Sequence, residues 1–301
     1  MNLLTSINLG VFLHTYNLSD SLKMIRECGF DGVDFSLWYF CQGEDAPLFR
    51  DDWREFIKDV RRMLYENGLT VPQAHAHWRH DGQIREDFSF DLPGEIFRRN
   101  IEACRMLGCS KLVFHPIQHF YPIENEEETR RKVIAANAAW FSALTDTAEE
   151  FGVQLLIENL FDYKHIQPDS APPPPLSRGE DIMETLRLIR HPLVNTCLDT
   201  GHAHIAGCDI PAMIRLYGKR LQALHLQDNY GRIYPIYEDI HQFPGTCSID
   251  WKNVFAALKE TDCDCHLNME LSAKLAGQPK AIQLLRCQNG RMLLLKMAEV
   301  Y

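Results

Sequence analysis

Four side chains of the types that bind metal ions close short apolar runs in this sequence: Glu158, Asp199, His225 and Glu270. The runs cover residues 154–157, 193–198, 221–226 and 267–269. Such runs are typical of the buried strands of a parallel sheet. Three carboxylates and one imidazole form an oxygen-rich donor set suited to a divalent ion such as Mn²⁺, Mg²⁺, Co²⁺ or Zn²⁺. The residue types therefore predict a site for one divalent metal ion, if the fold brings them together.

The elements that would bring these side chains together alternate along the chain. Strands are expected at residues 4–9, 32–37, 71–77, 112–115, 153–158, 194–199, 221–226 and 266–270. Amphipathic helices are expected at residues 19–28, 52–67, 92–107, 126–151, 179–190, 210–217, 250–259 and 280–298. In a parallel β/α barrel the carboxyl ends of all strands meet on one face, where the chemistry is done. We therefore predict an α/β fold: a single (β/α)8 TIM barrel with parallel strands and outer helices, occupying residues 1–301 as one domain.

One low-complexity stretch interrupts this alternation. Residues 167–176 include four consecutive prolines, Pro172–Pro175, in a loop near 167–178 that follows the fifth strand. Consecutive prolines favour a stiff polyproline-type segment, and a loop at this point would lie near the active face. The sequence leaves open whether the loop is a lid, a disordered surface loop or a linker.

The composition excludes several classes of protein. With 46% hydrophobic and 24% charged residues the chain is typical of a soluble globular protein, and no apolar stretch reaches the roughly 20 residues that span a bilayer. The first residues lack a signal-like pattern, and ten scattered cysteines then indicate a reducing cytoplasm. Cys263 and Cys265 form a CxC without a second pair, so a zinc knuckle is not expected. A net charge of −10 disfavours nucleic-acid partners.

Longer motifs surround the four candidate ligands. They are residues 197–207 (CLDTGHAHIAG), 224–229 (LHLQDN), 239–245 (DIHQFPG), 249–251 (IDW), 157–159 (IEN) and 268–270 (NME). With these motifs the chain resembles the xylose isomerase-like TIM-barrel superfamily over essentially its full length. That superfamily includes ketose 3-epimerases, hydroxypyruvate and inosose isomerases or dehydratases, and endonuclease IV. The resemblance implies that Glu158, Asp199, His225 and Glu270 are the metal ligands, and that Glu158 and Glu270 also act as catalytic acid and base.

This double use of the glutamates makes chemical sense. A proton beside a sugar carbonyl is a poor acid, and its loss leaves an enediolate whose negative charge a divalent ion can stabilise. A carboxylate on each face of the substrate can remove the proton from one side and return it from the other. Glu158 and Glu270 are the candidates for this pair.

A second set of polar residues is expected on the same face: His75, His77, His115, His202, Asp239 and His241. The resemblance implies contacts to substrate or to metal ligands in the sugar branch, and further zinc ligands in the endonuclease IV branch. Alternation along a strand does not decide between His75 and His77. Arg232, with Arg79 and Lys274, is an isolated cation that could meet a substrate hydroxyl or phosphate. His191, His204 and His266 are expected to be structural.

Aromatic residues in the predicted loops would cover the apolar faces of a sugar or, individually, pack the loops. They are Trp38, Tyr39, Phe40, Trp78, Phe120, Tyr121, Phe161, Tyr163, Tyr230, Tyr234 and Tyr237. Two positions depart from the family pattern. Cys247 replaces the usual glycine of a Pro-Gly-x-Gly turn, and Leu160-Phe161 replaces a histidine found in some members. No glycine-rich phosphate cradle is present, so phosphorylation of the substrate stays open.

These observations favour a divalent-metal-dependent isomerase or epimerase acting on a small ketose or keto-polyol through an enediolate. The expected partner is a small sugar, without nucleic acid or membrane, and a homo-oligomer is left open. An endonuclease IV-like zinc-dependent phosphodiester hydrolase and an inosose dehydratase-like lyase are the alternatives, because the fold alone does not determine the chemistry. A barrel that has lost its activity is disfavoured, because the ligand set is complete.

Overall fold

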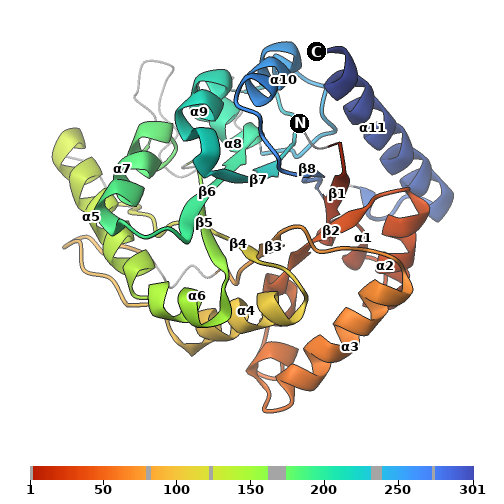
Figure 1. Cartoon of the computed structure of the whole chain (residues 1–301), viewed down its shortest axis with the longest axis horizontal. Helices are drawn as coiled ribbons and strands as arrows, with labels where there is room; N and C mark the ends of the chain where they lie inside the picture. The colour runs from red at the N-terminus through yellow and green to blue at the C-terminus, as the bar shows by residue number, and fades with distance from the viewer. Residues whose placement is uncertain (1–2, 79–82, 122–124, 162–173, 232–238, 273–274) are drawn as a thin grey trace.

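Eight parallel strands form a nearly closed barrel surrounded by helices in the computed structural model (Figure 1). Residues 3–78, 83–121, 125–161, 174–231, 239–272 and 275–301 are described. The strands are β1 (Thr5–Asn8), β2 (Gly32–Ser36), β3 (Ala74–His75), β4 (Lys111–Phe114), β5 (Gln154–Glu158), β6 (Val194–Asp199), β7 (Leu221–His225) and β8 (Leu267–Met269). Each strand from β1 to β6 pairs with the next, and β8 pairs with β1. The Leu226 amide donates to the Asn268 carbonyl (2.8 Å) and brings β7 beside β8. The predicted (β/α)8 TIM barrel is confirmed.

Helices follow the strands and cover the outside of the barrel (Figure 1). They are α1 (Gly10–Leu13), α2 (Leu18–Glu27), α3 (Trp53–Glu66), α4 (Glu95–Met106), α5 (Glu126–Ser142), α6 (Thr145–Phe151), α7 (Gly179–Ile189), α8 (Thr200–Ile205), α9 (Ile210–Tyr217), α10 (Trp251–Glu260) and α11 (Lys280–Val300). Short 3₁₀ turns lie at η1 (Leu37–Phe40), η2 (Pro47–Phe49) and η4 (Gly218–Arg220). In the described part of the chain, none of these helices has both the length and the apolar character needed to cross a bilayer.

The short helices α1 and α8 were not predicted, and two predicted elements differ in extent. The helix expected over residues 126–151 is two helices, α5 and α6. At the break the Ser142 hydroxyl donates to the Ala138 carbonyl and the Thr145 hydroxyl to the Ser142 carbonyl, and such local bonds compete with a continuous helix. Strand β3 is shorter than residues 71–77, and Pro72, which has no amide hydrogen to donate, precedes it.

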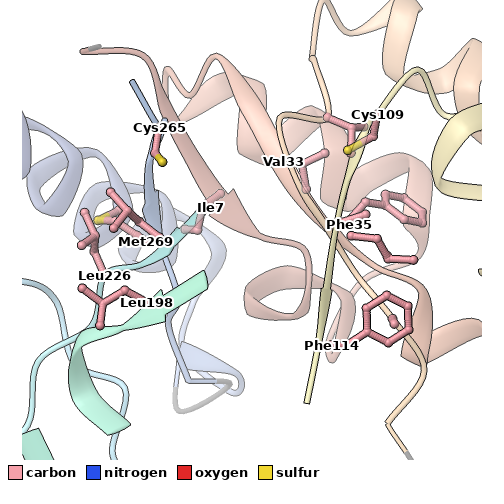
Figure 2. Packing of buried hydrophobic residues seen from close by; sticks show 14 of the residues in the cluster. Ile7, Val33, Phe35, Cys109, Phe114, Leu198, Leu226, Cys265 and Met269 are labelled. Carbon is pink, nitrogen blue, oxygen red and sulfur yellow. The ribbon is translucent and has the colours of Figure 1, made fainter. Parts of the chain in front are cut away.

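Alternation along the strands separates the interior of the barrel from the layer beneath the helices. Val113, Leu156, Cys197 and Ala223 form a small buried cluster of their own, contributed by β4 to β7. Their neighbours on the same strands, such as Phe114 and Leu198, belong instead to the large core shared with the helices (Figure 2). Because successive side chains point to opposite faces of a sheet, the small cluster fills the barrel interior.

The other half of the barrel interior is polar. On β8, β1 and β2, the Ser6 hydroxyl donates to Asn268 Oδ1 (2.8 Å), and Asn268 Nδ2 donates to Asp34 Oδ2 (3.1 Å). Gln73, which precedes β3, donates through Nε2 to the same Asp34 oxygen (2.8 Å). All four side chains are buried. Since buried polar groups are costly unless hydrogen-bonded, this network gives the barrel interior one preferred arrangement.

Candidate metal centre

The four predicted ligands lie together at the carboxyl end of the barrel. Glu158, Asp199 and His225 are the last residues of β5, β6 and β7, and Glu270 directly follows β8. One ligand-type atom from each of the four residues lies within 4.8 Å of those of the others. Glu158, Asp199 and His225 each lie two residues after a member of the small interior cluster. Because side chains alternate along a strand, all three therefore point into the mouth of the barrel.

His225 is at the centre of this group, because each of its ring nitrogens faces carboxylates. Its Nδ1 lies 3.1 Å from Glu158 Oε1, 3.2 Å from Glu270 Oε2 and 3.9 Å from Asp199 Oδ2. Its Nε2 lies 3.1 Å from Asp34 Oδ2, on the side of the polar network. Metal-binding histidines commonly pair their second nitrogen with a carboxylate, which holds the ring in orientation.

Asp34 was missed by the sequence analysis, although one signal was present. It is an acidic residue in the middle of the otherwise apolar and small-residue strand β2, and it is 2% exposed. A buried acid in such a strand needs partners, and here these are Gln73, Asn268 and His225. The sequence could not show that His225 would be one of them.

The donor set fits a divalent cation. Burial, together with the charges of Glu270 and Glu158, raises the pKa of Asp199 to about 8. Within the described residues, Glu270 Oε2 is buried and has no hydrogen-bond partner, since its 3.2 Å approach to His225 lacks hydrogen-bond geometry. Three carboxylates this close repel one another unless a positive charge lies between them. A hard cation would offset that repulsion and satisfy the orphaned oxygen.

Asp199 is held in place by the motif that follows it. Its side chain accepts a hydrogen bond from the His202 amide (2.6 Å) and caps α8. Its backbone amide donates to Asn159 Oδ1 (2.8 Å), and Gln227 Nε2 lies 3.3 Å from its Oδ1. A Cβ at Gly201 would come within 2.1 Å of Gln227 Cδ, which explains the glycine in the DTGH motif. The motif therefore positions one of the predicted ligands.

Two histidines lie against the second oxygen of Glu158. His75 Nε2 is 3.3 Å and His115 Nε2 is 3.4 Å from Glu158 Oε2, and the three residues form a second group able to hold a metal. His77 is placed elsewhere, because β3 ends at His75 and strict alternation stops there. Its ring packs against Phe49 and Phe97.

His202, Asp239 and His241 form a third such group. Asp239 Oδ2 lies 3.3 Å from His202 Nε2 and 2.5 Å from His241 Nε2. His202 Nδ1 also lies 3.3 Å from Glu158 Oε1, so this group adjoins the first. Arg232, with Arg79 and Lys274, lies outside the described residues, as do Tyr163, Tyr234, Tyr237 and most of the proline-rich loop.

Imidazoles surround Glu158 on both carboxylate oxygens. Burial alone raises the pKa of this carboxyl, but the nearby rings of His225, His115 and His202 outweigh burial. The pKa of Glu158 therefore lies well below its usual range, and the side chain is ionised. Burial likewise raises the pKa of Glu270, and the charges of His225 and His241 more than compensate. Both glutamates are thus available as proton acceptors.

A cavity of about 480 Å³ opens above these groups. Trp78, Phe161 and Leu160 line it together with His115, His202 and Glu270. The Trp78 ring lies tilted against the rings of His115 (5.4 Å between centroids) and Trp38 (6.4 Å), so aromatic side chains form one wall. Other predicted aromatics lie elsewhere: Phe40 packs against Phe35 and Phe56, and Tyr121 lines a separate cavity.

The two departures from the family pattern have different consequences. Phe161, at the place of a histidine, lies 5.2 Å from the His202 ring and makes this wall apolar. The turn containing Cys247 is held by buried Asp228, which accepts hydrogen bonds from the Gly245, Thr246 and Cys247 amides (3.0–3.1 Å). Among the described residues with positive φ, Gly245 (+84°) is present and Cys247 is absent, so the turn does not require glycine at 247.

Comparisons with known proteins agree with the barrel fold. An Escherichia coli K12 protein provisionally named as an L-ribulose-5-phosphate 3-epimerase is 24% identical over 281 residues, with 91% of each chain covered. Among solved structures, an L-ribulose 3-epimerase is 20% identical with a TM-score of 0.73, covering 99% of this chain and 95% of that one. The IOLI protein, solved with a bound zinc atom, is 17% identical with a TM-score of 0.73 and 98% of both chains covered.

The family profile described as xylose isomerase-like TIM barrel matches residues 22–287, which is most of the chain. The chain belongs to the xylose isomerase-like TIM barrel family.

Proposed function

We propose that this protein is a divalent-metal-dependent epimerase or isomerase that moves a proton beside the carbonyl of a small ketose or keto-polyol. The observation that carries the proposal is the placement of Glu158 and Glu270 on either side of His225, at 3.1 and 3.2 Å from the same Nδ1. The names of the relatives, which are sugar 3-epimerases, support the same substrate class.

In this mechanism Glu158 and Glu270 exchange protons with opposite faces of the substrate. Glu158 comes from β5 and Glu270 from the end of β8, with β6 and β7 between them in the sheet, so a sugar above His225 would meet one carboxylate on each side. One glutamate removes the proton beside the carbonyl, which leaves an enediolate, and the other returns a proton to the opposite face. Because the lowered pKa values keep both carboxyls ionised, either one can begin as the base.

Glu158, Asp199, His225 and Glu270 would hold the metal ion. A divalent ion bound there supplies Lewis-acid stabilisation of negative charge on the substrate oxygens. Asp34 orients the His225 ring from below, while Gln227 and Asn159 hold Asp199. Trp78 and Phe161 would cover the apolar face of the sugar and exclude water from the reacting carbons.

The test is proton exchange with solvent. The purified protein, loaded with Mn²⁺ or Co²⁺, is incubated with a panel of ketoses and inososes in deuterium oxide, and deuterium beside the carbonyl is measured by NMR. We expect incorporation with at least one sugar. Glu158→Gln and Glu270→Gln should each lower the rate by about 10²-fold or more, since general acid–base catalysis contributes that much. An amide oxygen can still bind metal, so metal affinity should fall less than activity.

Glu260→Gln is the matched control, because Glu260 lies at the protein surface in an ion pair with Arg215 (2.7 Å). This variant should exchange at the wild-type rate. Near-wild-type rates for either site variant on the true substrate would refute the two-glutamate mechanism.

A second candidate is a phosphodiester hydrolase with three metal ions. The observation that favours it is the presence of the two further groups, His75–His115–Glu158 and His202–Asp239–His241, beside the first. Metal analysis of the purified protein separates the two functions. One tightly bound ion per chain supports the sugar reaction, whereas three ions, together with incision of an abasic-site duplex, would support hydrolysis.

A further inference from the structure

Another cavity lies at the opposite end of the barrel from the metal centre. It has a volume of about 200 Å³, and its lining includes Lys111, Leu221, Cys263 and Cys265. Lys111 and Leu221 are the first residues of β4 and β7, and Cys265 precedes β8. In TIM barrels this amino-terminal face usually serves stability rather than catalysis. A pair of cysteines lining a cavity there is therefore unexplained by the sugar reaction.

The two thiols lie two residues apart in the chain and line the same cavity. The Cys265 thiol donates a hydrogen bond to the Leu221 carbonyl oxygen (3.5 Å). Cys263 and Cys265 are 7% and 3% exposed, but both line the cavity, so a small molecule can reach them. A disulfide requires two sulfurs on chain segments that lie close together. Only Asp264 separates these two cysteines, and both line the one cavity.

Charged groups around the pair favour ionisation of one thiol. Lys111 lines the same cavity, and its Nζ is held by the Gln222 carbonyl oxygen (2.8 Å). The interaction with neighbouring Cys265 and the Lys111 charge outweigh burial and the Asp264 charge, so the pKa of Cys263 is lowered to about 7. The interaction with Cys263, together with burial, raises the pKa of Cys265 well above its usual value. One sulfur is thus a nucleophile and the other a protonated partner.

A metal ion fits this pair poorly. Structural zinc takes roughly four ligands. Among the described residues, the groups of three or more metal-binding side chains all lie at the metal centre, and none includes Cys263 or Cys265. Lys219, another cation lining the cavity, is paired with Asp262 (3.4 Å). The arrangement suits a two-electron oxidation of the pair better than coordination.

We propose that Cys263 and Cys265 are a redox-active dithiol that a small hydroperoxide converts to a disulfide. The Cys263 thiolate attacks the peroxide, the O–O bond breaks, and Cys263 becomes a sulfenic acid while the peroxide leaves as an alcohol or water. The Cys265 sulfur then attacks Cys263, and the sulfenic oxygen leaves as water with the Cys265 proton. The dithiol loses two electrons and the peroxide gains them. A small thiol would reverse the reaction through a mixed disulfide.

The first experiment measures which cysteine of the folded protein reacts first with limiting iodoacetamide at pH 7, by peptide mass spectrometry. Cys208 and Cys247 are the internal comparison, because both are more exposed than Cys263. Burial raises the pKa of Cys208 to about 11 and also raises that of Cys247. We expect Cys263 to react on the order of tenfold faster than either, since far more of it is thiolate. Faster labelling of Cys208 or Cys247 would overturn the proposal.

The second experiment treats the folded protein with hydrogen peroxide. We expect the peptide containing Cys263 and Cys265 to lose two hydrogens, and dithiothreitol to restore them. In Cys265→Ser the sulfenic acid on Cys263 should persist and be captured by dimedone. Cys104 and Cys109 are the matched control pair, since both thiols are buried and donate to the Lys111 carbonyl oxygen, but neither lines the cavity. Oxidation of that pair before Cys263–Cys265, or no disulfide until the protein unfolds, would refute the proposal.

A third measurement tests the role of the lysine. Lys111→Gln removes the charge beside the pair and should slow alkylation of Cys263 several-fold at pH 7. Lys219→Gln removes an exposed charge from the same cavity rim and should change the rate little, because Lys219 is already paired with Asp262. Equal rates in both variants, with the fold intact by circular dichroism, would contradict the assigned role of Lys111.

Discussion

Replacing Asp34 with asparagine tests whether the polar half of the barrel interior serves the metal centre. Asp34→Asn keeps the size of the side chain and removes the charge that faces His225 Nε2 at 3.1 Å. The new amide oxygen can still accept from Gln73 or Asn268, so most of the network can persist. The His225 ring, however, loses the carboxylate that orients it and strengthens its Nδ1 as a ligand.

The size of the effect follows from this geometry. Loss of a carboxylate behind a metal-binding histidine typically lowers metal affinity by about 10- to 100-fold. That range corresponds to roughly 1.4–2.8 kcal/mol of binding free energy. Asp34 is 2% exposed, so solvent cannot replace the lost interaction and the effect should lie in the upper part of the range.

Isothermal titration of the metal-free protein with Co²⁺ or Mn²⁺ measures the affinity, and the visible spectrum of bound Co²⁺ reports changes in ligand geometry. Asp181→Asn is the control, because Asp181 is also buried but pairs with Arg130 on the outer helices. It should lower the free energy of unfolding without changing metal affinity or the spectrum. If Asp34→Asn bound the metal as tightly as the wild type with an unchanged spectrum, Asp34 would have only a packing role.

Three further outcomes are expected. Gly201→Ala should displace Gln227, because the new Cβ would lie 2.1 Å from Gln227 Cδ. We expect the free energy of unfolding, measured by thermal unfolding, to fall by about 1–3 kcal/mol and metal binding to weaken. The pKa of Asp199 is raised to about 8, so a proton must leave this carboxyl before the ion binds. Metal affinity should therefore fall by up to about tenfold per pH unit below pH 8, and a flat titration between pH 6 and 8 would contradict this. With a net charge of −10, binding to an abasic-site duplex should be absent at about 50 mM salt in a fluorescence anisotropy assay, whereas tight salt-sensitive binding would favour the hydrolase.

The strand ends were the most predictable part of the molecule. Glu158, Asp199 and His225 each close a run whose apolar character comes from burial between the barrel interior and the helices, so the sequence pattern marks the end of the strand directly. A parallel barrel brings all carboxyl ends to one face, so the residue types alone indicated that they would meet. The barrel itself followed from the same alternation of runs and helices.

Contacts that depend on side-chain packing across the barrel were not predictable. Whether His75 or His77 would reach Glu158 depends on where β3 ends, and a two-residue strand gives too short a pattern to mark its own end. Asp34 carried a local signal, but its partners Gln73, Asn268 and His225 lie on three other segments. These contacts join segments that are far apart in the sequence, so no local sequence pattern indicates them.

The alternation of side chains along the strands accounts for both the small apolar cluster and the metal centre inside the barrel. Leu156, Cys197 and Ala223 pack together in the barrel, and the next inward position on each strand is Glu158, Asp199 or His225. The apolar cluster therefore seals one side of the base of the metal centre. Across the barrel, Asp34 holds His225 from the polar network, so the centre rests on apolar packing on one side and on hydrogen bonds on the other.

The apolar half of the barrel interior is sensitive to a change of side-chain volume, and the polar network is sensitive to a change of charge. Substitutions in the two halves of the interior should therefore affect metal binding differently. Cys197→Ala should lower mainly the free energy of unfolding, by about 1–2 kcal/mol for a small cavity, whereas Asp34→Asn should lower mainly metal affinity.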